Sequence, residues 1–490
     1  SNVVGAQLGQ QAIKTSLIAG AIGLVLVGIF MIIVYALPGV VAALSLAIYT
    51  GLELVMLNAF DLTLTLPGIA GIILSIGMAV DANVIVFARV REEIATGKSV
   101  QTSMKIGFQK AMSAILDGNI TTLIASVVLM ALGSGTVKGF AYTLMIGIIL
   151  SLFTAMVVTR YILYSLYALG LKSEKLYGRA KERKSIDFIG KKAVFFTISG
   201  IIIAAGLISM GVHSATEGKA LNYGLDFMGG TSTTADFGKD MTIEDIENDI
   251  VPYVEEVTGD SDVQATKVEG TTQVTIKTRT LSLDERQKLE DTLAENCDVD
   301  ASTITSQSIS STISGEMRSD ALKAVIVSCI FMLLYIWFRF KDIRFAASAI
   351  LALVHDVLVV ITVYALVRIS VGSTFIACVL TIVGYSINDT IVIFDRIREN
   401  LALKTGKQTA EDLREIANKS LTQTLSRSIN TSITTFIMVV MLYILGVASI
   451  RDFSLPLMAG LVCGAYSSIC IATELWYVMK VHLGKNKATK

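Results

Sequence analysis

One segment of this chain, residues 77–93, recurs in similar form 307 positions later as residues 384–400. Each copy ends an apolar run, carries an aspartate within that run, and continues into an Arg-x-Arg-Glu sequence. An aspartate near the middle of a bilayer costs about 2.5–3.5 kcal/mol on insertion scales. A chain that bears this cost in both copies of a repeat is expected to use the carboxylates. The repeat therefore indicates a duplicated membrane protein with an ionisable pair at the interface between its halves.

Eleven apolar segments are long enough to span a bilayer as helices, which takes about 20 residues each. They are residues 16–37, 38–57, 67–88, 112–132, 139–160, 192–212, 319–340, 344–367, 373–394, 424–446 and 453–474. The composition agrees with a membrane protein, because 53% of the residues are hydrophobic and only 17% are charged. The formal net charge of zero conceals one strongly acidic segment, residues 213–318, in an otherwise basic chain. This segregation predicts a soluble domain there.

The connectors between the spans alternate in charge, which predicts an orientation. Lys and Arg gather in connectors 89–110, 171–192, 339–344 and 395–420, whereas connectors 58–66, 368–373 and 447–451 are short and carry few charges. Because cytoplasmic loops are enriched in Lys and Arg, these connectors and the C-terminus are predicted to be cytoplasmic. Residues 213–318 are then extracytoplasmic.

The spans predict the following domain organisation. It comprises an extracytoplasmic remnant at 1–15, a transmembrane half of five helices at 16–170, a cytoplasmic linker at 171–191, a single helix at 192–212, an extracytoplasmic domain at 213–318, five further helices within 319–478, and a basic cytoplasmic tail at 479–490. The second half has a helix and a domain before its five spans, whereas the first half has the five spans alone. By symmetry, we expect one helix and one large outer domain to precede Ser1 in the full protein.

The extracytoplasmic segment has the pattern of a small α+β domain. Extended runs occur at 221–227, 231–237, 262–268, 272–278 and 302–311, and helical patterns occur at 242–257 and 282–296. After the first strand the order is β-α-β-β-α-β, which is the ferredoxin-like arrangement. Cys297 is the only cysteine in this segment, so no disulfide is expected within the domain.

Several motifs follow one another along the chain. Residues 64–71 read Leu-Thr-Leu-Pro-Gly-Ile-Ala-Gly and lead into 77–83, Gly-Met-Ala-Val-Asp-Ala-Asn. Residues 224–231 read Gly-Leu-Asp-Phe-Met-Gly-Gly-Thr, and they are followed by His-Asp at 355–356 and Ser-Ile-Asn-Asp-Thr at 386–390. These motifs, which extend over essentially the whole chain, resemble those of the SecDF family of bacterial protein-export membrane proteins, in the resistance-nodulation-division superfamily.

The sequence departs from the pattern of that family at Ala88. The family usually has an acidic residue before the arginine, and the second copy of the repeat keeps Asp395 there. This departure puts only a local ion pair in doubt.

The resemblance implies an auxiliary subunit of the Sec machinery in the bacterial cytoplasmic (inner) membrane. Such proteins let protons, or sodium in some members, run down their gradient and so move an outer domain. The implied task is to promote translocation and release of an unfolded preprotein that leaves the SecYEG channel. The implied partners are SecYEG, the SecA motor ATPase, and YajC and YidC-type membrane proteins. The protein is expected to lie in the lipid bilayer, with no cofactor, no metal and no nucleic acid.

Two other functions are compatible with part of the pattern. An exporter of small molecules or lipids from the same superfamily is the main alternative, although such exporters generally carry two much larger outer domains. An enzyme is not expected, because the chain lacks a phosphate-binding Gly-x-x-x-x-Gly-Lys-Ser/Thr loop. The residues around the two aspartates also differ from the Tyr-Asp and Gly-x-Gly-Asp patterns of intramembrane aspartyl proteases.

Asp81, Asp389 and Arg427 are the predicted residues of the ion relay. Removal from water disfavours the charged form of a carboxylate, which suits it to bind and release protons. Asp81 aligns with Asn388, so Asp389 lies one position further on, about 100° around its helix. The two sites are therefore not equivalent, which favours a relay. The resemblance implies that Arg427, near the start of span 424–446, forms a switchable ion pair with Asp389. The alternative is an arginine that snorkels to the cytoplasm.

Other polar residues of the spans are candidates for relay or gating. They are His355, Asp356, Asn83, Asn119, Asn388, Thr390 and Asn430. The amides and hydroxyls are explained more simply as hydrogen bonds between helices. His355 and Asp356 form either a relay or a buried hydrogen-bonded pair.

Arginines also follow each aspartate, at positions 89 and 91 in the first copy and 396 and 398 in the second. We interpret them first as positive-inside anchors, with contact to the motor ATPase or the ribosome as the alternative.

Overall fold

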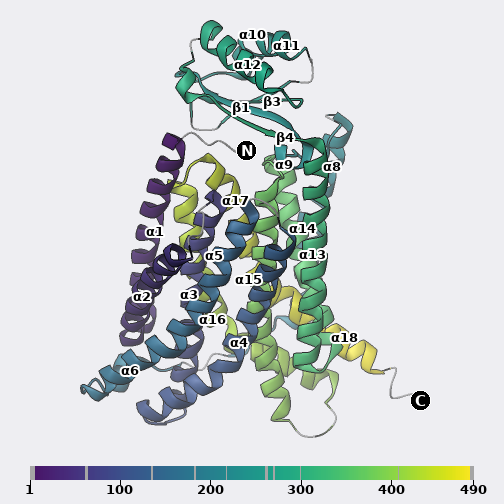
Figure 1. Ribbon diagram of the computed structural model, residues 1–490. Coiled ribbons are helices and arrows are strands. Elements are labelled where there is room, and N and C mark those ends of the chain that lie inside the picture. Colours follow the sequence, from purple (N-terminus) through teal and green to yellow (C-terminus); the bar gives the residue numbers. More distant parts are fainter. Residues whose placement is uncertain are drawn as a thin grey trace.

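The computed structural model describes residues 6–60, 65–133, 136–180, 184–216, 218–259, 263–268, 271–297, 299–404, 406 and 408–485. The predicted terminal segments 1–15 and 479–490 lie partly outside these residues. Among the described residues, eleven helices are long and apolar enough to cross a membrane, which confirms the predicted class of helical membrane protein. They form one bundle with a small α/β domain on top (Figure 1). We call the end of the bundle under this domain the domain end and the opposite end the loop end.

The two halves of the bundle have corresponding helices. The first half consists of α1 (Ala6–Tyr35), α2 (Leu37–Ala59), α3 (Leu66–Ala95), α4 (Val100–Leu132), and one span divided into α5 (Thr136–Phe153), η1 (Thr154–Val158) and α6 (Thr159–Ala168). The second half consists of α8 (Lys192–Thr216), α13 (Ser311–Phe340), α14 (Ile343–Val367), α15 (Ser373–Ala402), α16 (Ala410–Leu445), and one span divided into α17 (Ala448–Ser467), η4 (Ser468–Ala472) and α18 (Thr473–Lys485). Two short helices, α7 (Glu174–Tyr177) and η2 (Ile189–Lys191), belong to the linker.

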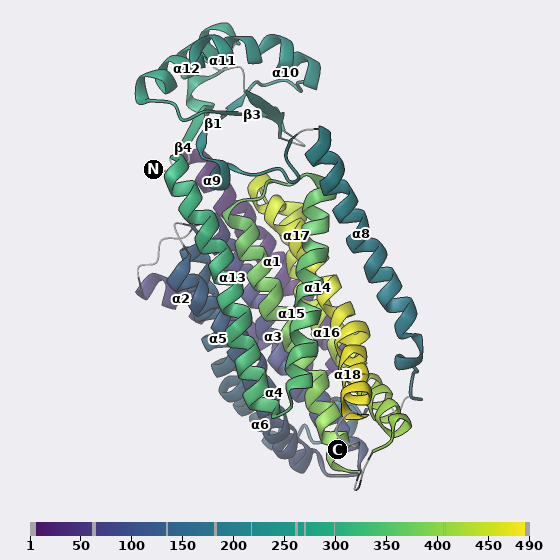
Figure 2. The ribbon, with the colours of Figure 1, turned by 90° about the vertical axis from the view of Figure 1, so that its right-hand side faces the viewer.

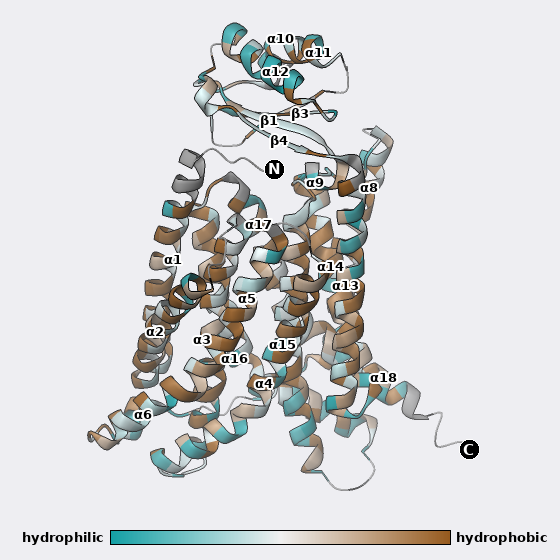
Figure 3. Cartoon of the chain, in the orientation of Figure 1, coloured by the Kyte–Doolittle hydropathy of each residue, from teal (hydrophilic) through white to brown (hydrophobic). Residues whose placement is uncertain are grey.

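The helices that carry the two aspartates lie at the centre of the bundle. In both α3 and α15, 94% of the most apolar stretch is buried by other helices, whereas the figure for α8 is 11%. Figure 2 shows α8 at the edge of the bundle. Hydrophobic residues predominate along the helices of the bundle, and hydrophilic residues gather at its loop end and in the outer helices of the domain (Figure 3). Polar side chains on α3 and α15 are therefore surrounded by protein and not by lipid.

The last span of each half contains a five-residue π-helix, η1 in the first half and η4 in the second. Their first residues, Thr154 and Ser468, lie 314 positions apart, which is within one residue of the offset of 313 between Phe140 and Phe453 at the start of the same spans, so the two π-helices occupy corresponding places in the repeat. A π-helix leaves the regular hydrogen-bond ladder and is frequently found at functional sites. The shared interruption is a mark of the duplication that the sequence motifs did not reveal.

The α/β domain confirms the predicted β-α-β-β-α-β order. Its elements are β1 (Gly230–Asp236), α10 (Ile243–Asp249), α11 (Val251–Thr258), β2 (Gln264–Lys267), β3 (Gln273–Thr278), α12 (Leu283–Asn296), η3 (Ala301–Thr303) and β4 (Thr305–Ile309). The strands form an antiparallel sheet in the order β2-β3-β1-β4. Val274 and Ile276 alternate inward on β3 and form a core with Leu289 and Leu293 of α12. The pattern at 242–257 is divided into two helices, because Pro252 in the first turn of α11 cannot continue α10.

The predicted first strand at 221–227 is wrong. Leu225–Met228 is a short helix, α9, and Tyr223 makes a single bridge with Val371 in the α14–α15 loop. That loop supplies the main-chain partners of the segment: Val371 N donates to Asn222 O at 2.7 Å, and Gly224 N donates to Val371 O at 2.9 Å. One loop residue cannot pair with a whole strand, so the chain turns into a helix instead.

Candidate functional site

Asp81 and Asp389 meet at the polar face of α16. Their exposed fractions are 4% and 6%. The Thr434 hydroxyl donates to Asp81 Oδ1 at 3.4 Å. The hydroxyls of Thr431 and Ser432 donate to the two oxygens of Asp389 at 3.4 and 3.5 Å. The two carboxylates are also close enough to interact electrostatically. The structure therefore brings the two predicted residues together inside the bundle, with neither side chain toward lipid.

A small cavity adjoins Asp81. It has about 10 Å³ of space for water, which is roughly the volume needed for a single molecule. Its polar lining comes from Asp81, Asn119, Thr122, Tyr385 and Asn388. The Asn388 Oδ1 and Tyr385 Oη atoms are buried and have no hydrogen-bond partner in the described part of the protein. Buried polar groups of this kind bind water in proteins. The sequence analysis missed Tyr385, since a tyrosine in an apolar run is ordinarily a packing residue.

Glycines bring the two halves together beside this cavity. A Cβ on Gly384 of α15 would lie 3.1 Å from Thr122 Cγ2 of α4, and a Cβ on Gly77 of α3 would lie 3.0 Å from Thr435 Cα of α16. The Thr122 hydroxyl also donates to Gly384 O at 3.0 Å. Gly77 corresponds to Gly384 in the repeat, so the two contacts are equivalent and cross the interface in both directions. Small residues allow this close approach of helices.

Arg427 is buried in the middle of α16, with an exposed fraction of 4%. The alternative of an arginine that snorkels to the cytoplasm does not match this burial. α16 begins 17 residues earlier, at Ala410. The Arg427 Nη2 atom donates to Val392 O at 3.4 Å. Among the ion pairs of the described residues there is none between Arg427 and Asp389, although the two charges interact electrostatically at longer range. A direct, switchable pair stays a prediction.

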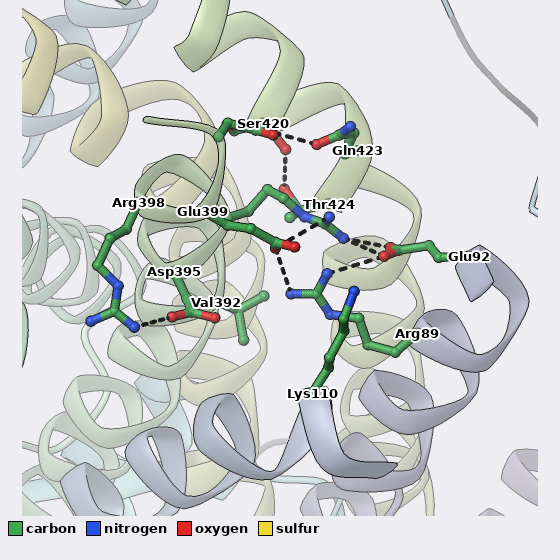
Figure 4. Close-up of polar contacts among 12 residues, drawn as sticks. Arg89, Glu92, Lys110, Val392, Asp395, Arg398, Glu399, Ser420, Gln423 and Thr424 are labelled. Carbon is green, nitrogen blue, oxygen red and sulfur yellow. Dashed lines mark hydrogen bonds and ion pairs between the residues drawn. The ribbon is translucent and has the colours of Figure 1, made fainter. Parts of the chain in front are cut away.

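Four charged residues join α3 to α15 at the loop end. We call Arg89, Glu92, Arg396 and Glu399 the ion-pair ring. Arg89 Nη2 lies 3.2 Å from Glu399 Oε2, and Arg396 Nη2 lies 2.6 Å from Glu92 Oε2. Figure 4 shows Arg89 between Glu92 and Glu399. The predicted role of Arg89 and Arg396 as positive-inside anchors stays a prediction, but neither side chain is free at the surface, because their exposed fractions are 4% and 7%. Both copies contain Arg-x-x-Glu, a spacing that predicts a contact within one helix but not the partner on the other helix.

The neighbouring arginines of the two copies differ. Arg398 pairs with Asp395 of the same helix at 2.6 Å. Arg91 has Ala88 in the corresponding place, so it donates instead to the carbonyl oxygens of Val34 and Tyr177. The local ion pair that the sequence put in doubt is therefore formed in the second half and replaced by main-chain contacts in the first.

Comparisons with known proteins identify the family. The family model described as "Protein export membrane protein SecD/SecF, C-terminal" matches residues 1–168 and 288–482. The chain belongs to the SecD/SecF family. The protein translocase subunit SecDF of Bacillus subtilis is 36% identical over 499 aligned positions, which cover 98% of this chain and 66% of the relative.

Two solved SecDF structures are similar to this SecD/SecF chain. The crystal structure of the translocon-associated SecDF of Thermus thermophilus has a TM-score of 0.86 at 34% identity, and it covers 99% of this chain and 64% of that protein. A SecDF structure in a super-membrane-facing form has a TM-score of 0.75 at 32% identity, with 98% and 64% covered. The chain thus spans about two thirds of the length of these relatives.

The amide and hydroxyl candidates of this SecD/SecF chain differ in what they contact. Asn119 and Asn388 line the cavity beside Asp81. Asn430 donates to the Tyr35 hydroxyl on α1 at 3.2 Å, and the hydroxyl of Thr390 lies 2.9 Å from that of Ser468 in η4. Asn430 and Thr390 therefore serve contacts between helices. Asn83, the remaining candidate, is also buried, and its Oδ1 has no partner in the described part of the protein.

Asp356 lies at the centre of a second buried polar cluster, away from the cavity. Its Oδ2 accepts hydrogen bonds from the hydroxyls of Ser386 and Ser467, at 2.6 and 2.7 Å. Its Oδ1 lies 3.0 Å from His355 Nδ1 and accepts from Cys463 Sγ at 3.2 Å. Both carboxylate oxygens are therefore fully hydrogen-bonded, as a buried charge requires. The arrangement matches the interpretation as a buried hydrogen-bonded pair.

His355 extends this cluster to the edge of the bundle. Its Nε2 lies 2.8 Å from the hydroxyl of Ser199 on α8. The ligand atoms of His355, Asp356 and Cys463 lie within 4.8 Å of one another and are of types that bind metals. The serine donors already occupy Asp356, however, so the contacts are those of a hydrogen-bond network that ties α8 to the second half.

Proposed function

We propose that this chain is the membrane part of an auxiliary subunit of the bacterial Sec protein-export machinery. It uses the transmembrane proton or sodium gradient to promote preprotein translocation and release on the outer face. The observation that carries this proposal is the burial of Asp81 and Asp389 together at the interface between the halves. Two carboxylates held by hydroxyls, one of them beside a water-sized cavity, are suited to take up and release an ion as the interface rearranges.

The ion path runs along α16. Thr434 contacts Asp81, while Thr431 and Ser432 contact Asp389. Hydroxyls both donate and accept hydrogen bonds, so they are able to pass a proton between the carboxylates. Oxygen atoms of carboxylates, hydroxyls and amides also suit a hard cation such as sodium. Arg427 lies on α16, one turn before Thr431, which contacts Asp389. It supplies the positive charge that balances Asp389 when the aspartate is ionised.

Asp226 supplies the link from the ion path to the outer domain. It precedes β1, and its Oδ2 accepts a hydrogen bond from Ser373 N, at the start of α15, at 2.9 Å. Asn222 Nδ2 donates to Arg368 O at 2.9 Å and ties the same segment to the end of α14. A shift of α15 that follows a change of charge at Asp389 would therefore move the base of the domain.

The orientation and partners follow from the family and the charge pattern. The loop end, rich in Lys and Arg, faces the cytoplasm, and the α/β domain faces the outside. Ile33, Ile201 and Phe338 are apolar and strongly exposed, so they are suited to contact lipid. The partners are SecYEG, SecA, YajC and YidC-type proteins, and the unfolded preprotein.

The test is ion flux into proteoliposomes under an imposed gradient, together with gradient-dependent preprotein translocation in vesicles. Asp389→Asn keeps the shape of the side chain but removes its charge, so flux and gradient-dependent stimulation are expected to fall to the level of empty vesicles. Gradients of protons alone and of sodium alone decide which ion is used. Full flux and full stimulation in the Asp389→Asn protein would show that the carboxylate is structural.

A further inference from the structure

The ion-pair ring lies between the aspartates and the loop end. Arg89 follows Asp81 by eight residues and Arg396 follows Asp389 by seven, which places the ring about 10–12 Å further along the two helices. Besides its two contacts across the helices, the ring has one contact within each helix, at 3.1 Å for Arg89–Glu92 and 3.4 Å for Arg396–Glu399. Each of the four residues therefore has one partner on its own helix and one on the other helix.

The ring repeats the internal symmetry of the protein. Arg396 and Glu399 lie 307 positions after Arg89 and Glu92, which is the offset of the repeat itself. The arginine side chains are 5% and 9% exposed, whereas those of Glu92 and Glu399 are 31% and 38% exposed. Buried guanidinium groups require partners, because an unpaired buried charge is strongly destabilising. Separation of α3 from α15 at this end would remove the partner that each arginine has on the other helix.

Arg427 breaks this symmetry. It lies seven residues before Thr434, and the residue seven before the corresponding Thr121 is Ala114. The charges that act on Arg427 are Arg89 and Arg396, which repel it, and Glu92 and Asp389, which attract it. Its Nε has no hydrogen-bond partner in the described part of the protein. Glu92 thus acts on a third arginine besides Arg89 and Arg396, and the other anion that acts on Arg427 is Asp389.

We propose that the ion-pair ring is the cytoplasmic gate of the ion path and that Arg427 makes it respond to Asp389. While Asp389 is ionised, it attracts Arg427 and the ring stays closed. When Asp389 binds its ion, Arg427 turns to Glu92 and competes with Arg396 for it. The contacts between α3 and α15 then weaken, and the path opens to the cytoplasm. This gate rests on the proposed ion flux through Asp389.

The test is passive ion flux through the reconstituted protein, measured without preprotein. The Glu92→Gln/Glu399→Gln variant leaves both ring arginines without an anionic partner, so the gate is expected to stay open and the flux to rise by about tenfold or more. Adding Asp389→Asn to this variant is expected to return the flux to background, because the path still requires Asp389. In the unmodified protein, the charge exchange Arg89→Glu/Glu399→Arg keeps one ion pair between the helices with its polarity reversed. Its flux is therefore expected to lie below that of Glu92→Gln/Glu399→Gln.

The matched control is Asp342→Asn. It breaks the Asp342–Lys480 pair, which lies within the second half and involves no member of the ring. Its flux is expected to equal that of the unmodified protein. Unchanged flux in Glu92→Gln/Glu399→Gln, with flux that still depends on Asp389, would overturn the gate and leave the proposed function intact. Flux that does not depend on Asp389 in the unmodified protein would overturn the proposed function itself.

Cross-linking tests the gate independently of ring stability. In a background without the five native cysteines, Arg89→Cys and Glu399→Cys are joined by a reductant-cleavable bis-thiosulfonate. This link is expected to abolish flux, and reduction is expected to restore it. The same link between Asp342→Cys and Lys480→Cys, which replaces the Lys480–Asp342 ion pair within the second half, is expected to leave flux unchanged. Full flux through the cross-linked Arg89–Glu399 pair would overturn the gate.

Discussion

Asp226 accepts hydrogen bonds from both the backbone nitrogen and the hydroxyl of Ser373. Ser373 is the first residue of α15, the helix that carries Asp389 and half of the ion-pair ring. A carboxylate at the N-terminus of a helix is stabilised by the unpaired N–H groups there and by the helix dipole. The residue that begins the outer domain is thus fixed to the helix that carries the ion site.

Asp226→Ala is expected to separate domain movement from ion flux. Loss of the carboxylate removes a cap worth about 1 kcal/mol, so the protein should fold, and amide exchange should rise at residues 221–228 and 373–376. Gradient-dependent export should fall while ion flux continues. Ser373→Ala is the control, since it keeps the bond from Ser373 N. Equal loss of flux and export in Asp226→Ala would contradict the link.

Arg427→Met is expected to abolish ion flux, because it removes from α16 the positive charge that acts on Asp389. Arg427→Lys keeps the charge without the guanidinium fork and is expected to retain part of the flux. Flux assays in proteoliposomes, with thermal unfolding as a control for folding, distinguish the two variants. Equal flux in Arg427→Met and the unmodified protein would show that the arginine serves only to pack α16.

Gly118→Ala is expected to disturb the cavity beside Asp81. A Cβ at Gly118 would overlap the side chain of Asn388. The strain is expected to cost about 1–3 kcal/mol of stability and to slow ion flux. Gly315→Ala on α13 is the control, because nothing lies within 4 Å of a Cβ there. That change should leave flux unaltered and raise helix stability slightly. Normal flux in Gly118→Ala would mean that Asn388 is not part of the path.

The linker before α8 is expected to detach from α16 at low pH. The Arg414 guanidinium, the Gly190 N–H and the Asn418 amide hold the pKa of the Asp187 carboxyl at about 2, below its usual 3.8. A pKa that is lower in the folded state gives stability that is present above the unfolded value and lost as pH falls through the folded one. Amide exchange of residues 184–191 should therefore rise between about pH 4 and 2. In Asp187→Asn the exchange should already be raised at pH 7, and an unchanged profile would contradict the linkage.

The sequence by itself determined the class of the protein, its spans and its two carboxylates. Apolar runs of bilayer length predict membrane helices wherever they occur, and alternation predicts the strands of the α/β domain. Asp81 and Asp389 stood out because their cost in an apolar run is a local property of the sequence, visible without any knowledge of neighbours. The repeat added that the two sites face a shared interface.

Only the tertiary structure decided which side chains meet. Arg396 lies 304 positions from Glu92, and no local pattern distinguishes a buried partner from a cytoplasmic anchor. The segment around Asp226 was predicted as a strand from its local propensity alone. That propensity does not depend on the α14–α15 loop, which holds the segment in the folded protein. The burial of Arg427 was hidden as well, since the first turns of α16 are polar and show no apolar pattern that would place them in a long helix. Partners and depth depend on how the helices pack, which sequence periodicity does not record.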